Sequence, residues 1–574
     1  MEAKPLPARP SLEQYKKQAK ELVKVFRAVQ SRKSPDSEAV HSEEAYSGAM
    51  RLGAVQRVKQ HHPRFADLPD DEIAGTKFAL ADAQFVIARE HGFESWPRFA
   101  EHVEELASAS FASSVSDPVA ALIEAACVPR AAWHSSGTLE RAEAILAAHP
   151  QVATANIYTA AILGDVVGVR RFLALDAQKA TAKGGSYGWD ALTYLCFSKY
   201  LRLDRARSKG FLRAAKALLD AGASANTGWL ETSHEPHPEW ESAIYGAAGI
   251  AQHPEVTRLL LERGADPNDG ETPYHVPETY DNTVLKILVE SGKLNDRSLT
   301  TLLLRKTDWH DFAGIKWLLE HGADPNRATH WGRTAFHHAV LRDNGIEIFE
   351  VLLEHGADPT LVAERPDLRL RDGPGMSAVA MAARRGRGDL LELMERRSIP
   401  IEFEGIEQLI AACARNDSAK VQAIAAEEPG LVRVLVVQGG KPLAEFAGAG
   451  NTDGVRQLLD LGVDVNAVTE DGDLYFDVAK NSTALHSAAW RARPATVKFL
   501  IERGAPVNAL DGKGRTALAL AVRACVDSYW KQRRTPETVE ALLKAGASVR
   551  GVKYPSGYGE VDELLRVHGA AAVE

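Results

Sequence analysis

Apolar positions recur along this chain with two helical patterns. Near the start, Ser11 is followed by apolar residues at Leu12, Tyr15, Ala19, Leu22, Val23 and Phe26, a spacing that predicts an amphipathic helix to about Val29. From residue 155 onward, a helix ending in Leu-Leu-x-x-Gly-Ala returns about eleven times, every 30 to 45 residues. Clear copies are Leu218–Ala223, Leu260–Ala265, Leu318–Ala323, Leu352–Ala357 and Leu542–Ala547, and Leu500–Ala505 is a variant. A phrase that returns at this spacing predicts a solenoid.

The first 106 residues predict a separate small helical domain. Two helices are expected between about 76 and 104, joined by the turn at His91-Gly92, with Ser95 capping the second. Their spacing resembles a helix-turn-helix, which makes a DNA-linked regulator one alternative for residues 76–106. Glu101, Glu104 and Glu105 on the second helix would repel phosphates, so a packed helical module is favoured. Residues 107–118 are expected to be a linker and 119–154 a helical connection.

A second motif is in register with the first and identifies the type of repeat. Thr334-Ala335-Phe336-His337-His338-Ala339 and Thr483-Ala484-Leu485-His486-Ser487-Ala488 match the T-P-L-H-x-A turn, and Thr272-Pro273-Tyr274-His275 matches its first half. Residues 155–574 therefore resemble ankyrin-repeat proteins, and the N-terminal module resembles one that precedes ankyrin arrays in some bacterial proteins. This resemblance predicts an all-α, irregular ankyrin-repeat solenoid of about 11 repeats with a C-terminal cap. Insertions, and the loss of the histidine near Ser377, make the array irregular.

Composition and charge narrow the possible functions. The chain has 574 residues and a formal net charge of −9, which argues against general nucleic-acid binding. Its four cysteines form no CxxC pair, and no run of 18 apolar residues or signal peptide is found, so a cytoplasmic protein without a membrane span is expected. No nucleotide-binding fingerprint is present, and no cofactor is expected.

The histidines give little support for a metal site, and none is predicted. In the ankyrin family the turn histidine, here His337 or His486, hydrogen-bonds between neighbouring turns. His234 and His237 flank Glu235 in an inserted segment, but no second cluster of ligand spacing supports them as metal ligands.

The resemblance also implies where a ligand would bind. Ankyrin arrays bind through their concave face, formed by the turn residues and the first helix of each repeat. Matching those positions, together with their neighbours, predicts a groove of Tyr187, Trp189, Trp240, Glu271, Tyr280, Asp281, Trp309, His330, Trp331, Arg333, Arg342, Trp490 and Arg491. Tryptophan is enriched at binding hot spots, whereas inserted segments that fold back would bury these rings as core instead.

Two functions fit such a groove. Binding of a protein or peptide partner is favoured, because aromatic anchors beside charged groups form hot spots. The alternative is a hydrolase, such as a glycosidase, acting on a glycan or another polar small molecule. Its candidate catalytic residues are Glu239, Glu241, Asp308 and His310, because paired carboxylates can hydrolyse a glycosidic bond.

Overall fold

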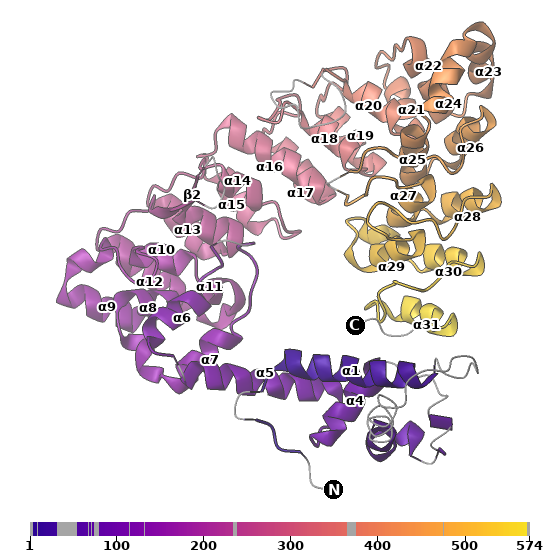
Figure 1. The fold of residues 1–574 in the computed structure, drawn as a ribbon. Coiled ribbons are helices and arrows are strands. Elements are labelled where there is room, and N and C mark those ends of the chain that lie inside the picture. Colours follow the sequence, from indigo (N-terminus) through magenta and orange to yellow (C-terminus); the bar gives the residue numbers. More distant parts are fainter. Residues whose placement is uncertain are drawn as a thin grey trace. The chain divides into compact units, whose positions relative to one another are not determined.

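The computed structural model describes most of the chain and divides it into two compact units. The described residues are 4–7, 10–30, 54–66, 68–69, 72–73, 78, 80–113, 115–130, 133–232, 238–363, 375–473 and 476–570. The first unit is Met1–Ala223 and the second begins at Ser224 and ends at Ala570. Both are helical, as Figure 1 shows, and the described residues form one two-stranded sheet. None of the helices in the described part of the chain is both long and apolar enough to cross a membrane.

The first unit begins with the N-terminal module. Its helices α1 (Leu12–Gln30), α4 (Leu80–Glu90) and α5 (Trp96–Ser113) contact one another. Tyr15, Leu22, Phe65 and Phe99 belong to their shared hydrophobic core. Helix α1 has the extent that its apolar spacing predicts. Helix α5 continues to Ser113, so the start of the segment expected to be a linker is helical.

The remainder of the first unit consists of short helices. Residues 119–154 were expected to be a helical connection, and they hold most of α6 and all of α7. The two pairs α8/α9 and α10/α12 come next and are the first of the repeated helix pairs. The bounds are α6 (Pro118–Ala126), α7 (Glu140–Ala148), η2 (Pro150–Thr154), α8 (Ile157–Ile162), α9 (Val166–Leu175), η3 (Ala177–Ala180), α10 (Ala191–Cys196), α11 (Lys199–Leu203), η4 (Arg205–Arg207) and α12 (Ser208–Asp220), with η1 (Pro63–Phe65) lying earlier, in the module.

The second unit stacks helix pairs in chain order. The first helices of successive pairs contact one another from α14 to α18 and on to α22, and again from α25 to α29. The elements are β1 (Gly228–Glu231), β2 (Glu239–Ser242), η5 (Tyr245–Ile250), α13 (Pro254–Glu262), α14 (Glu271–His275), α15 (Thr283–Glu290), α16 (Asp296–Asp308), α17 (Phe312–Glu320), α18 (Ala335–Leu341), α19 (Ile346–Glu354), α20 (Ala378–Arg384), α21 (Gly388–Arg396), α22 (Gly405–Ala414), α23 (Ser418–Glu427), α24 (Pro429–Val437), α25 (Gly440–Ala449), α26 (Thr452–Asp460), α27 (Ala484–Trp490), α28 (Pro494–Glu502), α29 (Ala517–Asp527), η6 (Lys531–Arg533), α30 (Glu537–Lys544) and α31 (Gly559–Val567).

The Leu-Leu-x-x-Gly-Ala phrase is a helix C-cap. Its glycine takes a left-handed backbone conformation, with φ of 90° at Gly264 and 91° at Gly322, which a residue with a Cβ adopts only at a cost. The chain can then turn back, so the alanine N–H donates to the carbonyl of the first leucine. This bond is 2.9 Å from Ala265 to Leu260 and 3.0 Å from Ala323 to Leu318. The two leucines are buried and the carbonyls at the helix end are satisfied.

Two further devices join neighbouring repeats. The His486 ring lies 2.8 Å from the Thr483 hydroxyl, and its Nε2 lies 3.1 Å from the Ala509 and Arg515 carbonyl oxygens of the next turn. Asn326 donates to the Gly356 carbonyl at 2.8 Å and accepts from the Asp358 N–H at 2.7 Å. The sequence pattern predicted the histidine bridge but not the asparagine bridge.

Candidate functional site

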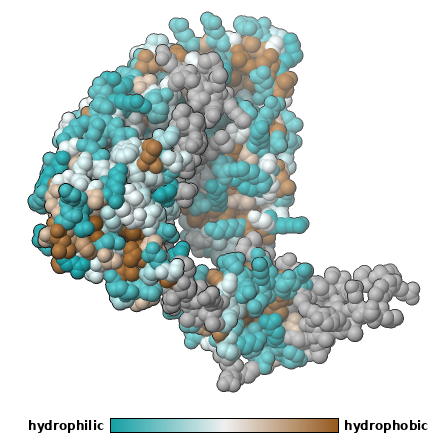
Figure 2. Space-filling view, turned by 60° about the vertical axis from the view of Figure 1, so that its left-hand side comes forward, coloured by the Kyte–Doolittle hydropathy of each residue, from teal (hydrophilic) through white to brown (hydrophobic). Residues whose placement is uncertain are grey.

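The acidic part of the predicted groove begins at the β1–β2 hairpin. The antiparallel register pairs Leu230 with Trp240 and Glu231 with Glu239. Because alternate residues of a strand point to opposite faces, Glu239 and Glu241 share one face and Trp240 lies on the other with Leu230. The Trp240 side chain is 44% exposed and that of Leu230 is 53% exposed, whereas Glu241 is buried. Figure 2 shows one face of the molecule, on which hydrophobic residues form separate patches among hydrophilic ones.

Three carboxyl groups converge beside this hairpin. Oxygens of Glu239, Glu241 and Glu271 lie within 4.8 Å of one another, and no other group of three or more His, Cys, Asp or Glu side chains in the described part of the chain is close enough to share a metal ion. Burial, together with repulsion from Glu271, raises the pKa of Glu241 to about 8. Glu241 is therefore mostly protonated at neutral pH and would have to lose that proton before the cluster could hold a cation. His234, Glu235 and His237 lie outside the described residues.

A chain of ion pairs leads from this cluster along the first helices. His275 Nε2 lies 3.2 Å from Glu271, and its Nδ1 lies 3.2 Å from Glu278. Although burial opposes its charge, hydrogen bonds to these two carboxylates raise the pKa of His275 to about 9. Glu278 in turn accepts from Arg305 at 2.7 Å. The chain of contacts thus passes from α14 to α16.

Asp308 is the next member of this network. It accepts from Arg305, from Arg342 and, at 2.9 Å, from His338 Nε2. Although burial opposes ionisation, these partners hold the pKa of Asp308 well below its usual range. Burial lowers the pKa of His338 to about 4, so we take His338 as a neutral donor and assign most of the stabilisation to the two arginines. An aspartate held ionised by three donors is a poor proton acceptor.

The four candidate catalytic residues do not form one site. Glu239 and Glu241 lie together with Glu271, while Asp308 is bonded to its own arginines. The His310 ring packs edge-on against Trp530 at 6.1 Å, and burial lowers its pKa to about 4. The expected grouping is therefore corrected, because the network of α16 and α18 holds Asp308 and the inserted segment around Trp530 covers His310.

That inserted segment contacts a described residue that lies 187 to 190 positions away in the sequence. Trp530 is fully buried, and its Nε1 donates to the Asp343 carbonyl oxygen at 3.3 Å. The Asp343 carboxylate accepts from Arg493 and Arg533, each at 2.8 Å, and lies 3.5 Å from Arg387. Although burial opposes ionisation, these arginines hold the pKa of Asp343 well below its usual range. Asp343, just after α18, thus binds residues that lie 150 and 190 positions later in the chain.

The predicted aromatic residues fall into two groups, of which the first is accessible. The Tyr280 side chain is 43% exposed, and its ring packs edge-on against half-buried Trp309 at 5.5 Å. Half-buried Trp331 lies 5.8 Å from Tyr274 and 3.9 Å from the ring of exposed His330. The remaining positions of this stretch are Asp281, which is exposed and accepts from the Thr283 N–H at the start of α15, and Arg333 and Arg342, which are half-buried.

The second group is buried. Trp490 is 3% exposed and lies in a core cluster with Trp530 and Phe476, and the Arg491 guanidinium lies 4.6 Å from the centre of the Phe476 ring. In the first unit, Trp189 is 5% exposed and packs against Tyr194 and Phe197. Half-buried Tyr187 lies beside Trp189 at 4.9 Å. Trp189, Trp490 and Arg491 are therefore corrected from groove residues to core residues, because inserted or neighbouring segments pack over them.

Several residues of the network were missing from the sequence interpretation. Glu278, Arg305 and Tyr274 connect the acidic cluster to Asp308 and to Trp331. Tyr274 to Glu278 lie at and after the end of α14, and Arg305 is one turn from the end of α16. These residues all lie at or near the ends of first helices, and that shared position is the feature of the sequence that could have identified them.

Two family models support the repeat assignment. A family model described as ankyrin repeats in three copies matches residues 409–511 and 443–551, and one described as ankyrin repeats in many copies matches 305–353. A solved structure, the human ASB11 ankyrin repeat domain, is 22% identical; the match covers 48% of this chain and 98% of that one, with a TM-score of 0.20. No curated protein matches the chain. The two family models and the stacked helix pairs show that the chain contains ankyrin repeats and folds as an irregular all-α solenoid.

Proposed function

We propose that the chain binds a protein or peptide partner through an aromatic–acidic surface of its second unit. This surface consists of the residues Glu239, Glu271, Tyr274, Tyr280, Asp281, Trp309, His330 and Trp331, and it leaves out Trp240 because that side chain lies on the opposite face of the hairpin from Glu239. The observation that carries the proposal is the row of partly exposed rings from Trp331 through Tyr274 that leads, by way of His275, to the carboxylates of Glu271 and Glu239. Ankyrin repeats are typically protein-interaction domains, which agrees with this use of the surface.

The chemistry of the surface indicates the kind of partner. Tyr280 exposes nearly half of its side chain, and aromatic residues commonly act as anchors at interfaces. The exposed Asp281 directly follows Tyr280 in the chain, and the carboxylates of Glu239 and Glu271 lie together on the same surface. A segment with an apolar residue beside lysine or arginine is therefore the complementary partner.

The test is capture on the immobilised full chain, with identification of bound proteins and measurement of their affinity. We expect the double variant Tyr280→Ala, Trp331→Ala to weaken binding by about 30-fold, the size of a hot-spot loss. The matched control is Trp133→Ala, which removes a tryptophan that is 66% exposed in the first unit. Equal loss with the control, or none with the double variant, would contradict the proposal.

A second candidate function, hydrolysis of a glycosidic bond, is favoured by one observation. A carboxyl group with a raised pKa, Glu241, lies beside a second carboxylate, Glu271, as an acid and a nucleophile would in a retaining glycosidase. It ranks second because the Glu241 side chain is only 1% exposed, which leaves little room for a sugar to reach it. Release of reducing sugar from a glycan panel, lost in Glu241→Gln, would support it, and no release by the unaltered chain would exclude it. The DNA-binding alternative for residues 76–106 stays a prediction.

A further inference from the structure

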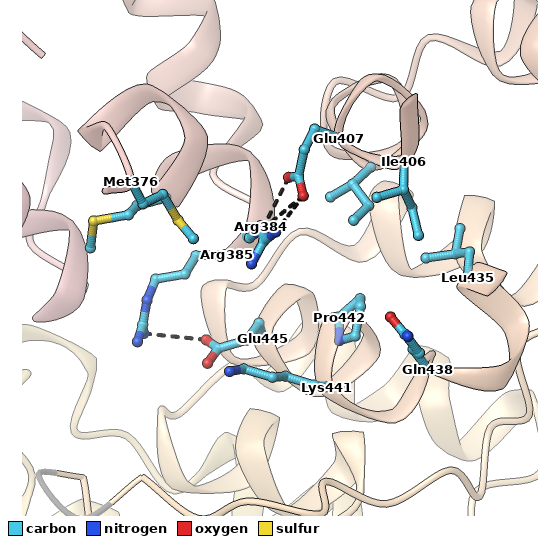
Figure 3. Close-up of a pocket in the computed structure, with 12 residues that line it drawn as sticks. Met376, Arg384, Arg385, Ile406, Glu407, Leu435, Gln438, Lys441, Pro442 and Glu445 are labelled. Atoms are coloured by element: carbon cyan, nitrogen blue, oxygen red, sulfur yellow. Dashed lines mark hydrogen bonds and ion pairs between the residues drawn. The ribbon is translucent and has the colours of Figure 1, made fainter. Parts of the chain in front are cut away.

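A pocket opens in a different part of the second unit, where the repeat pattern is least regular. It is lined by residues of α20, α22, α24 and α25, and Figure 3 shows their side chains pointing into a common space. We call it the α20–α25 pocket. Helix α24 is an additional helix between α23 and α25, and α25 contacts α20 as well as α26 and α27. The extra helix interrupts the regular stacking of first helices, and the pocket lies at that interruption.

The lining of the pocket is apolar at its base. Met376, Met381, Ile406, Ile410, Leu435 and Pro442 supply this surface, and Leu435, Ile410 and Met381 are buried. Methionine side chains adapt to irregular apolar shapes, so the two methionines suit a variable apolar group. The base of the pocket therefore fits a hydrophobic group that leaves water.

The size of the pocket restricts that group. Its volume is about 210 Å³. An apolar cavity of about 150 Å³ admits benzene, whereas sites for drug-sized ligands measure about 300–1,000 Å³. The pocket therefore accepts one bulky side chain, such as phenylalanine, leucine or tryptophan, and is too small for a nucleotide or an oligosaccharide.

The apolar surface continues outside the pocket along α24. Val437 is 85% exposed and Val434 is 43% exposed, on the helix that contributes Leu435 to the lining and is followed by the lining residue Gln438. A single small molecule seated in the pocket would leave these valines uncovered. A peptide segment that inserts one side chain and continues over α24 would cover Val434, which shares a helix face with Gln438 four residues later, so we favour a peptide over a free small molecule.

The rim selects the charge of that peptide. Arg384 forms a forked pair with Glu407, and Glu445 lies between Arg385 and Arg491 at 3.3 and 3.5 Å. Of these paired groups Arg384 is the most exposed, at 49%, whereas Glu407 is 22%, Glu445 17% and Arg385 12% exposed. Lys441 is the other exposed charged group of the rim. The charges that an incoming chain meets first are therefore cations.

We propose that the α20–α25 pocket binds a peptide segment that carries one bulky apolar side chain flanked by acidic residues. The apolar side chain fills the base formed by the methionines and isoleucines, and the flanking carboxylates approach Arg384 and Lys441. This site goes beyond the aromatic–acidic surface, because it lies on other repeats and prefers the opposite charge. One chain could in this way hold two segments of different charge.

The experiment selects peptides from a displayed library of random 12-residue sequences on the immobilised full chain. The strongest synthetic peptide is then measured by fluorescence anisotropy. We expect a selected sequence with Phe, Trp, Leu or Met and at least two Asp or Glu nearby. Met376→Trp, which fills the pocket from its half-buried wall, is expected to weaken this peptide by about tenfold or more, since it displaces a buried apolar side chain. Lys441→Glu tests the rim without touching the core.

Controls separate this proposal from the proposed function. Lys420→Glu reverses an exposed lysine on neighbouring α23 and is expected to leave the affinity unchanged, as is Trp331→Ala on the aromatic–acidic surface. A selected peptide that is basic, or that binds equally to Met376→Trp, would overturn the proposal. Sedimentation of the chain with phosphatidylserine vesicles, reduced by Lys441→Glu, would instead assign the valines of α24 to a membrane surface and would also overturn it.

Discussion

Replacing Asp343 with asparagine is expected to loosen the connection between the middle and the end of the second unit. The side chain is 2% exposed, and its carboxylate receives Arg493 and Arg533 at 2.8 Å. Asparagine keeps the shape and removes the charge, so two guanidinium groups lose their counter-ion. Arg387 is affected less because it retains Asp389 at 2.9 Å.

The expected cost follows from the burial of the group. Removing one partner of a buried ion pair costs about 3–5 kcal/mol, and asparagine can still accept a hydrogen bond, so we expect about 3 kcal/mol. Helix pairs in a solenoid are stabilised mainly by their neighbours. Because a contact that joins distant repeats is weakened, the variant should unfold in two separate urea transitions. The unaltered chain should show fewer transitions.

The assay is urea unfolding followed by far-ultraviolet circular dichroism and tryptophan fluorescence. Asp453→Asn is the matched control, since this aspartate is 61% exposed and lies 3.7 Å from Arg456, and its loss should cost less than about 1 kcal/mol. A further test combines Asp343→Asn with Arg533→Met, which should cost less than the sum of the two changes. An Asp343→Asn variant as stable as the control would refute the reasoning.

The pH dependence gives the same prediction an independent check. The pKa of Asp343 is lower in the folded chain than in the unfolded chain, where an aspartate titrates near about 3.9. Its stabilising contribution is therefore complete above about pH 4 and is lost as the pH falls from there towards the lower folded pKa. The Asp343→Asn variant should lack this part of the acid loss of stability.

Two other changes have expected outcomes of different kinds. Asn326→Ala removes both hydrogen bonds that join its repeat to the next, at 2.8 and 2.7 Å, and should lower the free energy of unfolding by about 1–2 kcal/mol. A decrease of less than about 0.5 kcal/mol in urea unfolding would contradict this. Glu241 has a folded pKa of about 8, above its unfolded value, so it favours folding at low pH and this contribution falls by up to about 1.4 kcal/mol per pH unit between about pH 5 and 8. Glu241→Gln should therefore unfold at a higher temperature than the unaltered chain at pH 9 and show no such gain at pH 5, and an equal effect at both pH values would count against the raised pKa.

The repeat register was predictable because each phrase fixes its own local structure. Gly264 needs a left-handed backbone and Ala265 then returns its N–H to Leu260, all within six residues. The inserted segments carry no such local rule. Trp530 is buried by contacts with Asp343 and Phe476, which are far away in the sequence, so its core position follows from tertiary packing alone.

The same distinction explains which groove residues were accessible. Tyr280 and Trp331 lie on turns that no described segment of the chain covers completely. Trp490, in contrast, packs in one core cluster with Trp530 of the inserted segment. An aromatic residue at a groove position can thus serve a partner or an insertion, and sequence spacing alone does not separate the two uses. Exposure does.

Closure of the array by Asp343 also affects where partners can bind. Arg493 and Arg533 come from the late repeats and bind Asp343, just after α18. The first-helix face next to Asp343 is therefore occupied by the chain itself. The exposed rings and carboxylates lie before this point in the chain, on the β1–β2 hairpin, α14 and the turn before α18, and the α20–α25 pocket lies after it. If partner binding required the whole concave face, Asp343→Asn would increase affinity by releasing the late repeats. Because both surfaces are accessible with the Asp343 contacts in place, we expect the affinity of either segment to be unchanged in that variant even as its stability falls.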